Sequence, residues 1–428
     1  MARKMKDSGI EWIGEIPEGW EIVPVRSCFD EVRTKNTDGQ EQNALQFKSG
    51  NIISKTNFNA SMDDYVADTI TNYTVVLPDT VMINGLNLNY DFKSLRVALV
   101  KEKGVITSAY LAIFPDRKKI FPQYATYLFK GYETKMAFHN MGAGIRKTLG
   151  YKEFKNQPLL LPSKEEQNKI SAYLDSKGSH IDIMLSKIRS SIEEYKKLKQ
   201  AVITQAVTKG VRGEREMKDS GVEWIGAIPK DWKIKRLKSF CTIVDCKNRT
   251  PDVFPDGKYT VVRTTCIKDC SFSYEGSYQT DTTNFKAWTL KGQPHKGDIF
   301  FTREAPVGEA CLVPNADNLC MGQRVMFFRP EDNSDARYIM YSIYGPLVRE
   351  YIASKNSGST VGHLKLGQVA CIPIFYCPPL EQKEIADYLD AKCAEIDGLI
   401  AKKEQLVKEL EGYKKSLIYE VVTGKREV

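Results

Sequence analysis

The clearest potential for catalysis in this chain lies in two carboxylates and a lysine of its first half. Pro78-Asp79 is followed by Asp91-Phe92-Lys93, and the second half has no matching motif. Two carboxylates that hold a divalent ion, with a lysine that steadies the attacking water, are typical of a metal-dependent nuclease. A turn followed by a solvated strand would contain the same residues. A stand-alone nuclease is therefore one alternative interpretation of the chain.

Three asparagines between these carboxylates indicate nucleic-acid binding instead. The segment INGLNLNYDF carries Asn84, Asn87 and Asn89, and the last two share one face if the segment is extended. Asparagine can form two hydrogen bonds with adenine in the major groove of DNA, and arginine can do so with guanine. We predict that these three side chains contact DNA.

A second polar group lies in the other half of the chain. FTREAPVGEA places Thr302, Arg303 and Glu304 before a proline turn, and GQR adds Gln323 and Arg324. These side chains carry the donors and acceptors that distinguish base edges. We predict that they contact DNA as well.

Each half also contains a loop of small and polar residues, GAGIRKTL at 142–149 and SGSTVGHL at 357–364. Small residues allow close approach to DNA phosphates, and phosphate contacts fix the register of a protein on the duplex. An ordinary polar loop is the alternative for any single residue, but the two loops recur at matching places. The predicted contacts are Arg146, Lys147, Ser359, Thr360 and His363.

Other enzymatic chemistry has no motif in the sequence. GAG at 142–144 lacks the third glycine of a nucleotide-binding loop, and no Walker-type phosphate loop occurs. Four scattered histidines do not make a catalytic set with serine or cysteine. The ten cysteines lack the two-residue spacing of a zinc site. We expect a non-catalytic chain with reduced cysteines and no metal or cofactor of its own.

Length and charge limit the class of protein. The chain has 428 residues, 42% of them hydrophobic, which exceeds one ordinary domain of roughly 100–200 residues. The net charge of +8 permits a nucleic-acid partner without requiring one. No apolar run approaches the roughly 18–20 residues of a membrane helix, and MARKMKDSGIEW has no apolar signal region. We expect a cytoplasmic protein with two or more domains and no membrane partner.

The chain contains an internal repeat. MKDSGIEWIGEIPEGW at 5–20 returns as MKDSGVEWIGAIPKDW at 217–232, with twelve of sixteen positions identical. A second pair, EEQNKISAYLDSKGSHID at 165–182 and LEQKEIADYLDAKCAEID at 380–397, repeats with nearly the same spacing. The tryptophans of the first pair are expected to pack at a domain edge. Because the middles of the two halves share little, the repeat predicts one scaffold with two different specificities.

A seven-residue apolar repeat accompanies the second motif in each half. It predicts one long helix from Ser163 to Val207, with Ser163 and Glu166 as a capping box, and a matching helix near the end of the chain. About 45 residues would make a rod of roughly 65–70 Å. Two unrelated amphipathic helices are the alternative to an intramolecular antiparallel pair. The predicted coiled-coil or partner interface consists of Leu174, Ile181, Leu185, Ile188, Ile192, Tyr195, Val202, Leu389, Ile396, Ile400, Val407, Leu410 and Leu417.

Several strings resemble the specificity subunits of type I restriction–modification systems. They are DSGIEWIGEIPEGW and its repeat, FTREAPVGEACLV with GQRVM, GSTVGHL, and PPLEQKEIADYLD with its partner PSKEEQNKISAYLD. The first copy departs from the family pattern, since Pro-Ser replaces Pro-Pro and IRKTL replaces the STV loop.

The resemblance implies a mixed α/β fold with a pseudo-two-fold internal repeat. Two α/β target-recognition domains would be separated by a long antiparallel two-helix coiled coil. The implied segments are 1–160 for the first recognition domain, 161–212 for the first long helix and linker, 213–375 for the second recognition domain, and 376–428 for the second long helix.

The resemblance also implies a function. Each recognition domain would read one half of a split site in double-stranded DNA, and the helices would set the spacer between the halves. Two modification subunits would use S-adenosylmethionine to methylate adenine, and restriction subunits would use ATP and magnesium to cleave unmodified DNA. None of that chemistry would reside in this chain. A repressor-like DNA-binding protein that needs no methyltransferase is the other alternative.

Overall fold

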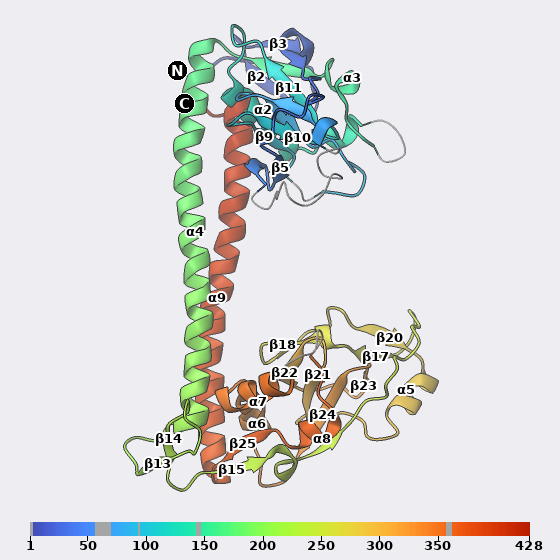
Figure 1. Ribbon diagram of the computed structural model, residues 1–428, viewed down its shortest axis with the longest axis vertical. Coiled ribbons are helices and arrows are strands. Elements are labelled where there is room, and N and C mark those ends of the chain that lie inside the picture. Colours follow the sequence, from blue (N-terminus) through green and yellow to red (C-terminus); the bar gives the residue numbers. More distant parts are fainter. Residues whose placement is uncertain (1–2, 56–69, 93–94, 143–146, 357–361) are drawn as a thin grey trace. The chain divides into compact units, whose positions relative to one another are not determined.

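The computed structural model of the chain has mixed α/β structure (Figure 1). It describes residues 3–55, 70–92, 95–142, 147–356 and 362–428. The mixed class and the long helices predicted from the sequence are both confirmed.

The chain divides into two compact units. Unit 1 comprises Met1–Arg189 and Gln405–Val428, and unit 2 comprises Ser190–Glu404. The long helices α4 (Lys164–Lys209) and α9 (Pro379–Val422) contribute one segment to each unit. The two divisions, after Arg189 and after Glu404, fall at equivalent positions of the sequence repeat.

Unit 1 is built around a four-stranded antiparallel sheet in the order β4-β11-β8-β9. Val81, Ile83 and Val97 of the sheet are fully buried, as are Tyr124 and Leu128 of the helix α2 that packs on it. Short apolar strands under an apolar helix face therefore form one core. The bounds are β4 (Phe29–Glu31), β8 (Val81–Ile83), β9 (Val97–Leu99), β11 (Leu111–Pro115) and α2 (Pro122–Thr134).

The other elements of unit 1 are short strand pairs and helical turns around this sheet. They are β1 (Met5–Asp7) with β2 (Glu15–Pro17), β3 (Glu21–Pro24) with β12 (Pro158–Leu161), β5 (Leu45–Lys48) with β6 (Asn51–Ser54), β7 (Thr74–Val76) with β10 (Gly104–Ile106), η1 (Val25–Ser27), η2 (Ala137–Asn140) and α3 (Tyr151–Phe154).

Unit 2 is built around a sheet with the same topology, in the order β16-β24-β21-β22. Phe301, Met326 and Phe328 of the sheet are fully buried against Tyr338 and Ile339 of α6. The middles of the two halves differ in sequence, so the apolar pattern of the strands maintains the shared order. The bounds are β16 (Cys241–Val244), β21 (Ile299–Arg303), β22 (Val307–Leu312), β24 (Val325–Pro330) and α6 (Ala336–Ile343).

Unit 2 adds a three-stranded sheet, β20-β17-β23, in which β17 and β23 run parallel. The remaining elements surround the two sheets. The bounds are β17 (Tyr259–Val262), β20 (Tyr278–Thr280), β23 (Leu319–Met321), β13 (Met217–Asp219) with β14 (Ala227–Pro229), β15 (Lys233–Arg236) with β25 (Pro373–Tyr376), β18 (Ile267–Lys268) with β19 (Ser271–Phe272), η3 (Leu237–Ser239), η4 (Thr264–Cys266), α5 (Thr282–Trp288), α7 (Pro346–Asn356) and α8 (Leu366–Ala370).

The start of α4 corrects one prediction. Ser163 caps the helix, because its Oγ accepts a hydrogen bond from the Glu166 backbone N–H at 3.3 Å. The Glu166 carboxylate does not close the predicted capping box. It accepts a hydrogen bond from the Trp20 indole Nε1 at 2.9 Å and forms an ion pair with Arg3.

In unit 1 the two helix segments run antiparallel. Asp182 pairs with Lys414 at 2.6 Å, and Arg189, further along α4, pairs with Glu411, nearly one turn back along α9. Leu174, Ile181 and Leu185 are buried in the same core as Leu417 and Val421.

The helix segments of unit 2 repeat this contact with the roles exchanged. Lys199 of α4 pairs with Asp397 of α9 at 2.6 Å, and the sequence repeat aligns these two residues with Lys414 and Asp182. Unit 2 is therefore built from the same parts as unit 1.

Burial on the two helices follows the predicted stripe. Each of the thirteen predicted interface residues is buried or half-buried. The buried ones are Leu174, Ile181, Leu185, Ile192, Leu389, Ile396 and Leu417, and the half-buried ones are Ile188, Tyr195, Val202, Ile400, Val407 and Leu410.

The repeated tryptophans are not equivalent in their packing. Trp20 and Trp232 are buried, as expected, and Trp12 packs edge-on against Tyr132 with ring centroids 4.7 Å apart. Trp224 is 62% exposed, so the prediction that it packs at the domain edge is wrong. Each described helix is too short or too polar to cross a membrane.

Candidate nucleic-acid interface

In unit 2, three separate segments meet at one end of the central sheet. Arg303 ends β21, and Arg324 directly precedes the neighbouring strand β24, so the two residues lie at the same end of the sheet. The Arg303 N–H donates to the Arg324 carbonyl at 3.1 Å. The third segment joins through a bridge between Glu304 and His363. One Glu304 carboxylate oxygen lies 3.1 Å from Arg324 Nε and 3.5 Å from His363 Nδ1. Glu304, Arg324 and His363 thus form one polar group.

Two predicted contacts in this region are corrected by burial. Thr302 is fully buried, and its hydroxyl donates to the Pro306 carbonyl at 2.6 Å and accepts from the Glu309 N–H at 3.0 Å. Arg303 is 8% exposed and donates to both carboxylate oxygens of Asp245 and to Asn248 Oδ1. Both side chains are bound inside the protein, so neither is available to a DNA base in this conformation.

The loop that follows β16 belongs to the same group and was missed from the sequence. Asn248 lies beside Gln323, whose Nε2 is 3.4 Å from the Asn248 carbonyl. The cations of Lys247 and Arg249 lie over the Trp288 ring, 4.7 and 5.3 Å from its centroid. The adjacent basic residues in CKNR were the available signal, but they occur in a part of the chain without an internal counterpart.

Unit 1 has a polar loop after β8, the strand that corresponds to β21 of unit 2. Asn84, Asn87 and Asn89 all lie in it, and Asn87 is exposed. The loop is a turn, because the N–H groups of Tyr90 and Asp91 both donate to the Asn87 carbonyl. The segment is therefore not extended, and the condition under which Asn87 and Asn89 would share one face is not met.

The second predicted loop of unit 1 reaches the asparagine turn. The Leu88 N–H donates to the Lys147 carbonyl at 3.2 Å, and the Leu149 N–H donates to the Gly85 carbonyl at 2.9 Å. Lys147 is exposed and has a φ of 41°, a left-handed conformation that is rare for lysine. The predicted contacts Arg146, Ser359 and Thr360 lie outside the described residues.

A buried arginine organises the asparagine turn. Arg96 Nη1 donates to the carbonyls of Asn84 and Leu86, both at 2.9 Å, and Nη2 donates to the Asp91 carbonyl. Burial lowers the pKa of the Arg96 guanidinium, and the Asp91 carboxylate at 3.7 Å acts in the opposite direction. The Arg96 backbone N–H donates to Glu133, and burial raises the pKa of that carboxyl to about 7.

The carboxylates of the nuclease interpretation do not converge. Asp79 precedes β8 and pairs with Arg117, whereas Asp91 lies beyond the other end of that strand and pairs with Arg96. Lys93 lies outside the described residues. Among the residues that the structure describes, no group of three or more His, Cys, Asp or Glu side chains is placed to hold a metal ion. The two carboxylates thus lie beyond opposite ends of β8, and each is bound by a different arginine.

Residues 229–409 match the family described as the type I restriction modification DNA specificity domain. Two relatives from Methanocaldococcus jannaschii extend the similarity over the whole chain. One, named a putative type I restriction enzyme MjaX specificity subunit, is 24% identical over 96% of this chain and 95% of its own length. The other, named the type I restriction enzyme MjaVIII specificity subunit, is 23% identical over 96% and 93%. Residues 229–409 thus form a type I specificity domain, and the chain as a whole is similar to type I specificity subunits.

A solved structure has the same fold as this chain. It comes from work on complex assembly and conformational transition of the type I R-M system, and it matches with a TM-score of 0.67 and 16% identity over 96% of this chain and 99% of that one. The resemblance to type I specificity subunits predicted from the sequence strings is confirmed by the family match and the two relatives.

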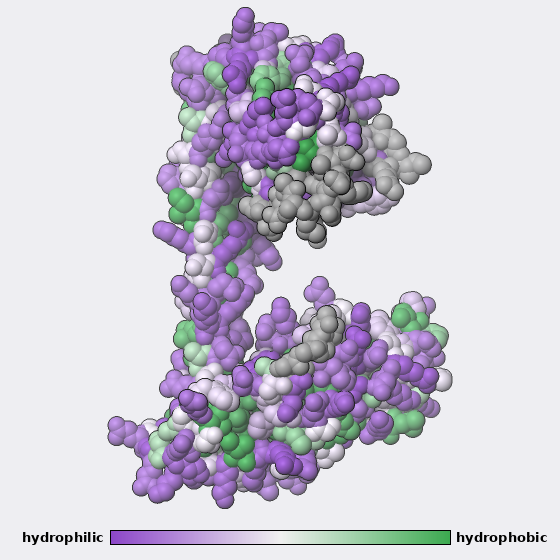
Figure 2. Space-filling model, viewed as in Figure 1, coloured by the Kyte–Doolittle hydropathy of each residue, from purple (hydrophilic) through white to green (hydrophobic). Residues whose placement is uncertain are grey.

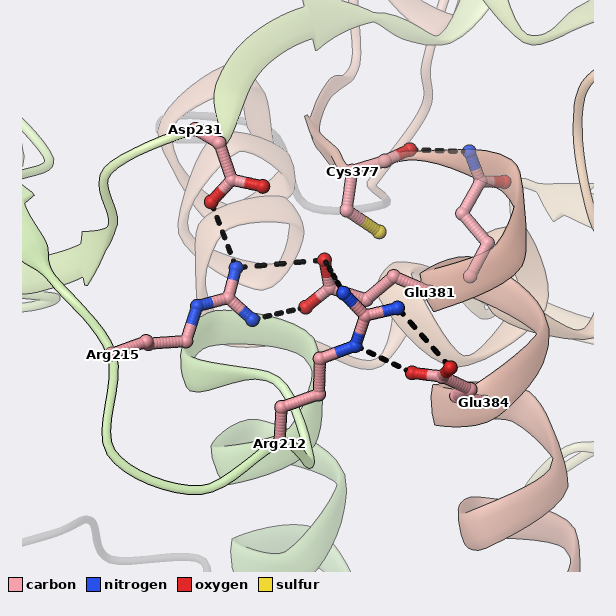
Figure 3. A network of polar contacts seen from close by, with 7 residues as sticks. Arg212, Arg215, Asp231, Cys377, Glu381 and Glu384 are labelled. Atoms are coloured by element: carbon pink, nitrogen blue, oxygen red, sulfur yellow. Dashed lines mark hydrogen bonds and ion pairs between the residues drawn. The ribbon is translucent and has the colours of Figure 1, made fainter.

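The chain also has a charged cluster where each long helix begins. In unit 2, Arg215 binds both the fully buried Glu381 and Asp231, and Arg212 donates to the two oxygens of Glu384 at 2.7 and 3.1 Å (Figure 3). In the same cluster, Gln382 Nε2 donates to the Cys377 carbonyl at 2.9 Å. This cluster attaches the linker after α4 to the first turn of α9.

Unit 1 has the matching cluster in a simpler form. Arg3, Trp20 and Glu166 take the places of Arg215, Trp232 and Glu381. Both arginines lie over their tryptophan ring, at 5.4 and 5.6 Å from the centroid. The clusters bind side chains of the same unit, so their role is to hold each unit together.

Hydrophilic residues cover most of the surface of both units that is visible in Figure 2.

Proposed function

We propose that this specificity subunit recognises a split DNA target, with one half-site bound by each unit. The observation that carries the proposal is that two central sheets of the same strand order end in two unlike polar groups. A shared scaffold positions the two ends alike, while their different side chains select different bases. The chain itself acts as a non-catalytic recognition subunit.

In unit 1 the proposed DNA contacts are Asn84, Asn87, Asn89 and Lys147, with Arg146 as a further predicted contact. Asn87 and Lys147 are exposed at adjoining loops, which suits an amide for adenine and a lysine for phosphate. These contacts are local to one unit, so unit 1 is sufficient for one half-site.

In unit 2 the proposed contacts are Glu304, Gln323, Arg324 and His363, with Ser359 and Thr360 as further predicted contacts. Glu304 can accept a hydrogen bond from cytosine, and Arg324 can donate two to guanine once DNA displaces their mutual ion pair. This chemistry differs from the amides of unit 1, which supports two different half-sites.

We further propose that α4 and α9 form one antiparallel coiled coil that sets the distance between the half-sites. The reciprocal pairs Asp182–Lys414 and Lys199–Asp397 support this arrangement. Two recognition domains on the same face of B-DNA must lie about 34 Å apart, or a multiple of it. The helices are long enough for such a spacer.

The partners would be double-stranded DNA, two modification subunits and restriction subunits. The modification subunits would use S-adenosylmethionine to methylate adenine, and the restriction subunits would use ATP and magnesium to cleave unmodified DNA. The specificity subunit would direct both reactions to the target sequence.

The test is to express the chain with its modification subunit and map methylated adenines in the host DNA. We expect two short specified sequences separated by a stretch of fixed length and random composition. Methylation within one contiguous target would contradict the proposal, and so would DNA cleavage by the purified chain with magnesium alone.

A further inference from the structure

Each unit buries one arginine at the same end of its central sheet. Arg96 directly precedes β9 and binds the loop that follows β8, and Arg303 ends β21, the strand that corresponds to β8. Arg96 is 1% exposed and Arg303 is 8% exposed. The two arginines come from different strands, so the sequence repeat does not account for their shared location.

Arg96 is bound to the loop that carries proposed DNA contacts of unit 1, and Arg303 is bound to a loop that contacts Gln323, a proposed DNA contact of unit 2. Arg96 binds three backbone carbonyls of the asparagine turn, and Arg303 binds Asp245 and Asn248 of the loop beside Gln323. A planar guanidinium holds several acceptors at fixed angles, whereas an ammonium acts as a point charge. Each arginine therefore fixes the shape of one loop.

Core packing does not explain these two residues. Moving a guanidinium out of water is unfavourable unless its hydrogen bonds are complete, and an apolar side chain of similar volume is often as stable. Within the described residues, the Nε atoms of Arg96 and Arg303 have no hydrogen-bond partner. The arginines fix the geometry of the loops, which an apolar side chain would not do.

We propose that Arg96 and Arg303 are positioning residues, each of which sets the base specificity of the half-site bound by its own unit without touching DNA. The inference rests on the proposed function, because it assigns one loop to each half-site. It predicts that substitution of one arginine changes base discrimination at one half-site and leaves the other half-site unchanged.

The test uses the complex with modification subunits and measures methylation of a DNA library in which each half-site is varied separately. With Arg96→Lys, discrimination at the half-site of unit 1 falls by about ten-fold or more, the size of one good base contact, and the other half-site is unchanged. With Arg303→Lys the effect falls on the half-site of unit 2 alone.

Matched controls come from the opposite end of the same strands. Arg117 pairs with Asp79 before β8, and Arg329 pairs with Asp298 at 2.7 Å before β21. Arg117→Lys and Arg329→Lys make the same chemical change and leave both half-sites unchanged.

Two milder variants decide the question if a lysine variant fails to fold, as judged by its melting temperature. Asn248→Ala removes an acceptor of Arg303 at an exposed position, and Asp91→Asn weakens the 3.7 Å ion pair with Arg96. Each relaxes only the half-site of its own unit. Wild-type discrimination in these folded variants, or an equal loss at both half-sites, overturns the inference. A wild-type complex that methylates a contiguous target instead overturns the proposed function.

Discussion

Glu133 combines burial with three neighbouring cations, and its protonation links pH to the stability of unit 1. Burial raises the pKa of Glu133 to about 7, against the opposing effect of Arg96, Lys130 and Lys415. An unfolded glutamate has a pKa of about 4.3. The folded unit therefore binds the proton more tightly than the unfolded chain, and this contribution to stability is complete below about pH 4 and lost as pH rises through about 7.

Replacing Glu133 by glutamine should remove that pH dependence. Glutamine does not titrate, and its Oε1 can still accept the Arg96 N–H. We expect the unfolding midpoint of wild type to fall relative to Glu133→Gln between about pH 5 and pH 8. The exposed Glu11→Gln is the control and should follow wild type. Parallel curves for wild type and Glu133→Gln would refute this account.

At the level of single residues, the sequence identified the polar segments but not which side chains face solvent. Thr302, Arg303 and Glu304 are adjacent in one motif, yet only Glu304 remains free of the core. Burial depends on strand pairing with distant segments, so residue type alone does not reveal it. The turn at Asn87 depends likewise on Arg96, which directly precedes another strand, β9.

At the level of helices, the stripe on α9 predicts which leucines stabilise unit 1. Leu417 is 2% exposed in the unit 1 core, whereas Leu406 on the same helix is 42% exposed. We expect Leu417→Ala to lower the free energy of unfolding by about 2–5 kcal/mol, and Leu406→Ala to change it by less than about 0.5 kcal/mol. Denaturant titration of the two variants checks this, and equal effects would mean that the stripe is not the packed face.

Close packing between α2 and α9 gives a second prediction for helices. A Cβ on Gly131 would lie 2.5 Å from a methyl carbon of Val422, while a Cβ on Gly412 would meet open space. Gly131→Ala should therefore destabilise unit 1 by about 1–3 kcal/mol. Gly412→Ala should be stabilising by up to about 1 kcal/mol, since alanine favours the helix. Melting curves test both, and a neutral Gly131→Ala would show that α9 can shift away.

The helices themselves were predictable because a seven-residue apolar repeat is a local pattern. The predicted helix from Ser163 to Val207 is observed as Lys164–Lys209. The strand order of the central sheets was not predictable, because it depends on pairings between segments far apart in the chain. The role of the Glu166 carboxylate in the predicted capping box was also misassigned, because Trp20 and Arg3 approach Glu166 from another part of the chain.

At the level of the whole molecule, the repeat accounts for two units made of the same parts. Matching clusters at the helix starts and exchanged ion pairs on the helices occur at positions that the repeat relates to each other. Sequence comparison within the chain found this relationship because both copies keep their landmarks. The bases of the DNA target could not be predicted from the sequence, because they depend on the shape of loops that have no counterpart in the other half.

We propose that the helices set the length of the spacer and that the two units select the bases. Inserting three seven-residue heptads after Arg189 and another three after Glu404 keeps the apolar stripe in register and lengthens both helices by about 32 Å. Mapping of methylated adenines should then give the same two half-sites with a spacer longer by about nine base pairs, which is close to one turn of DNA. An unchanged spacer, or altered bases in either half-site, would contradict the account.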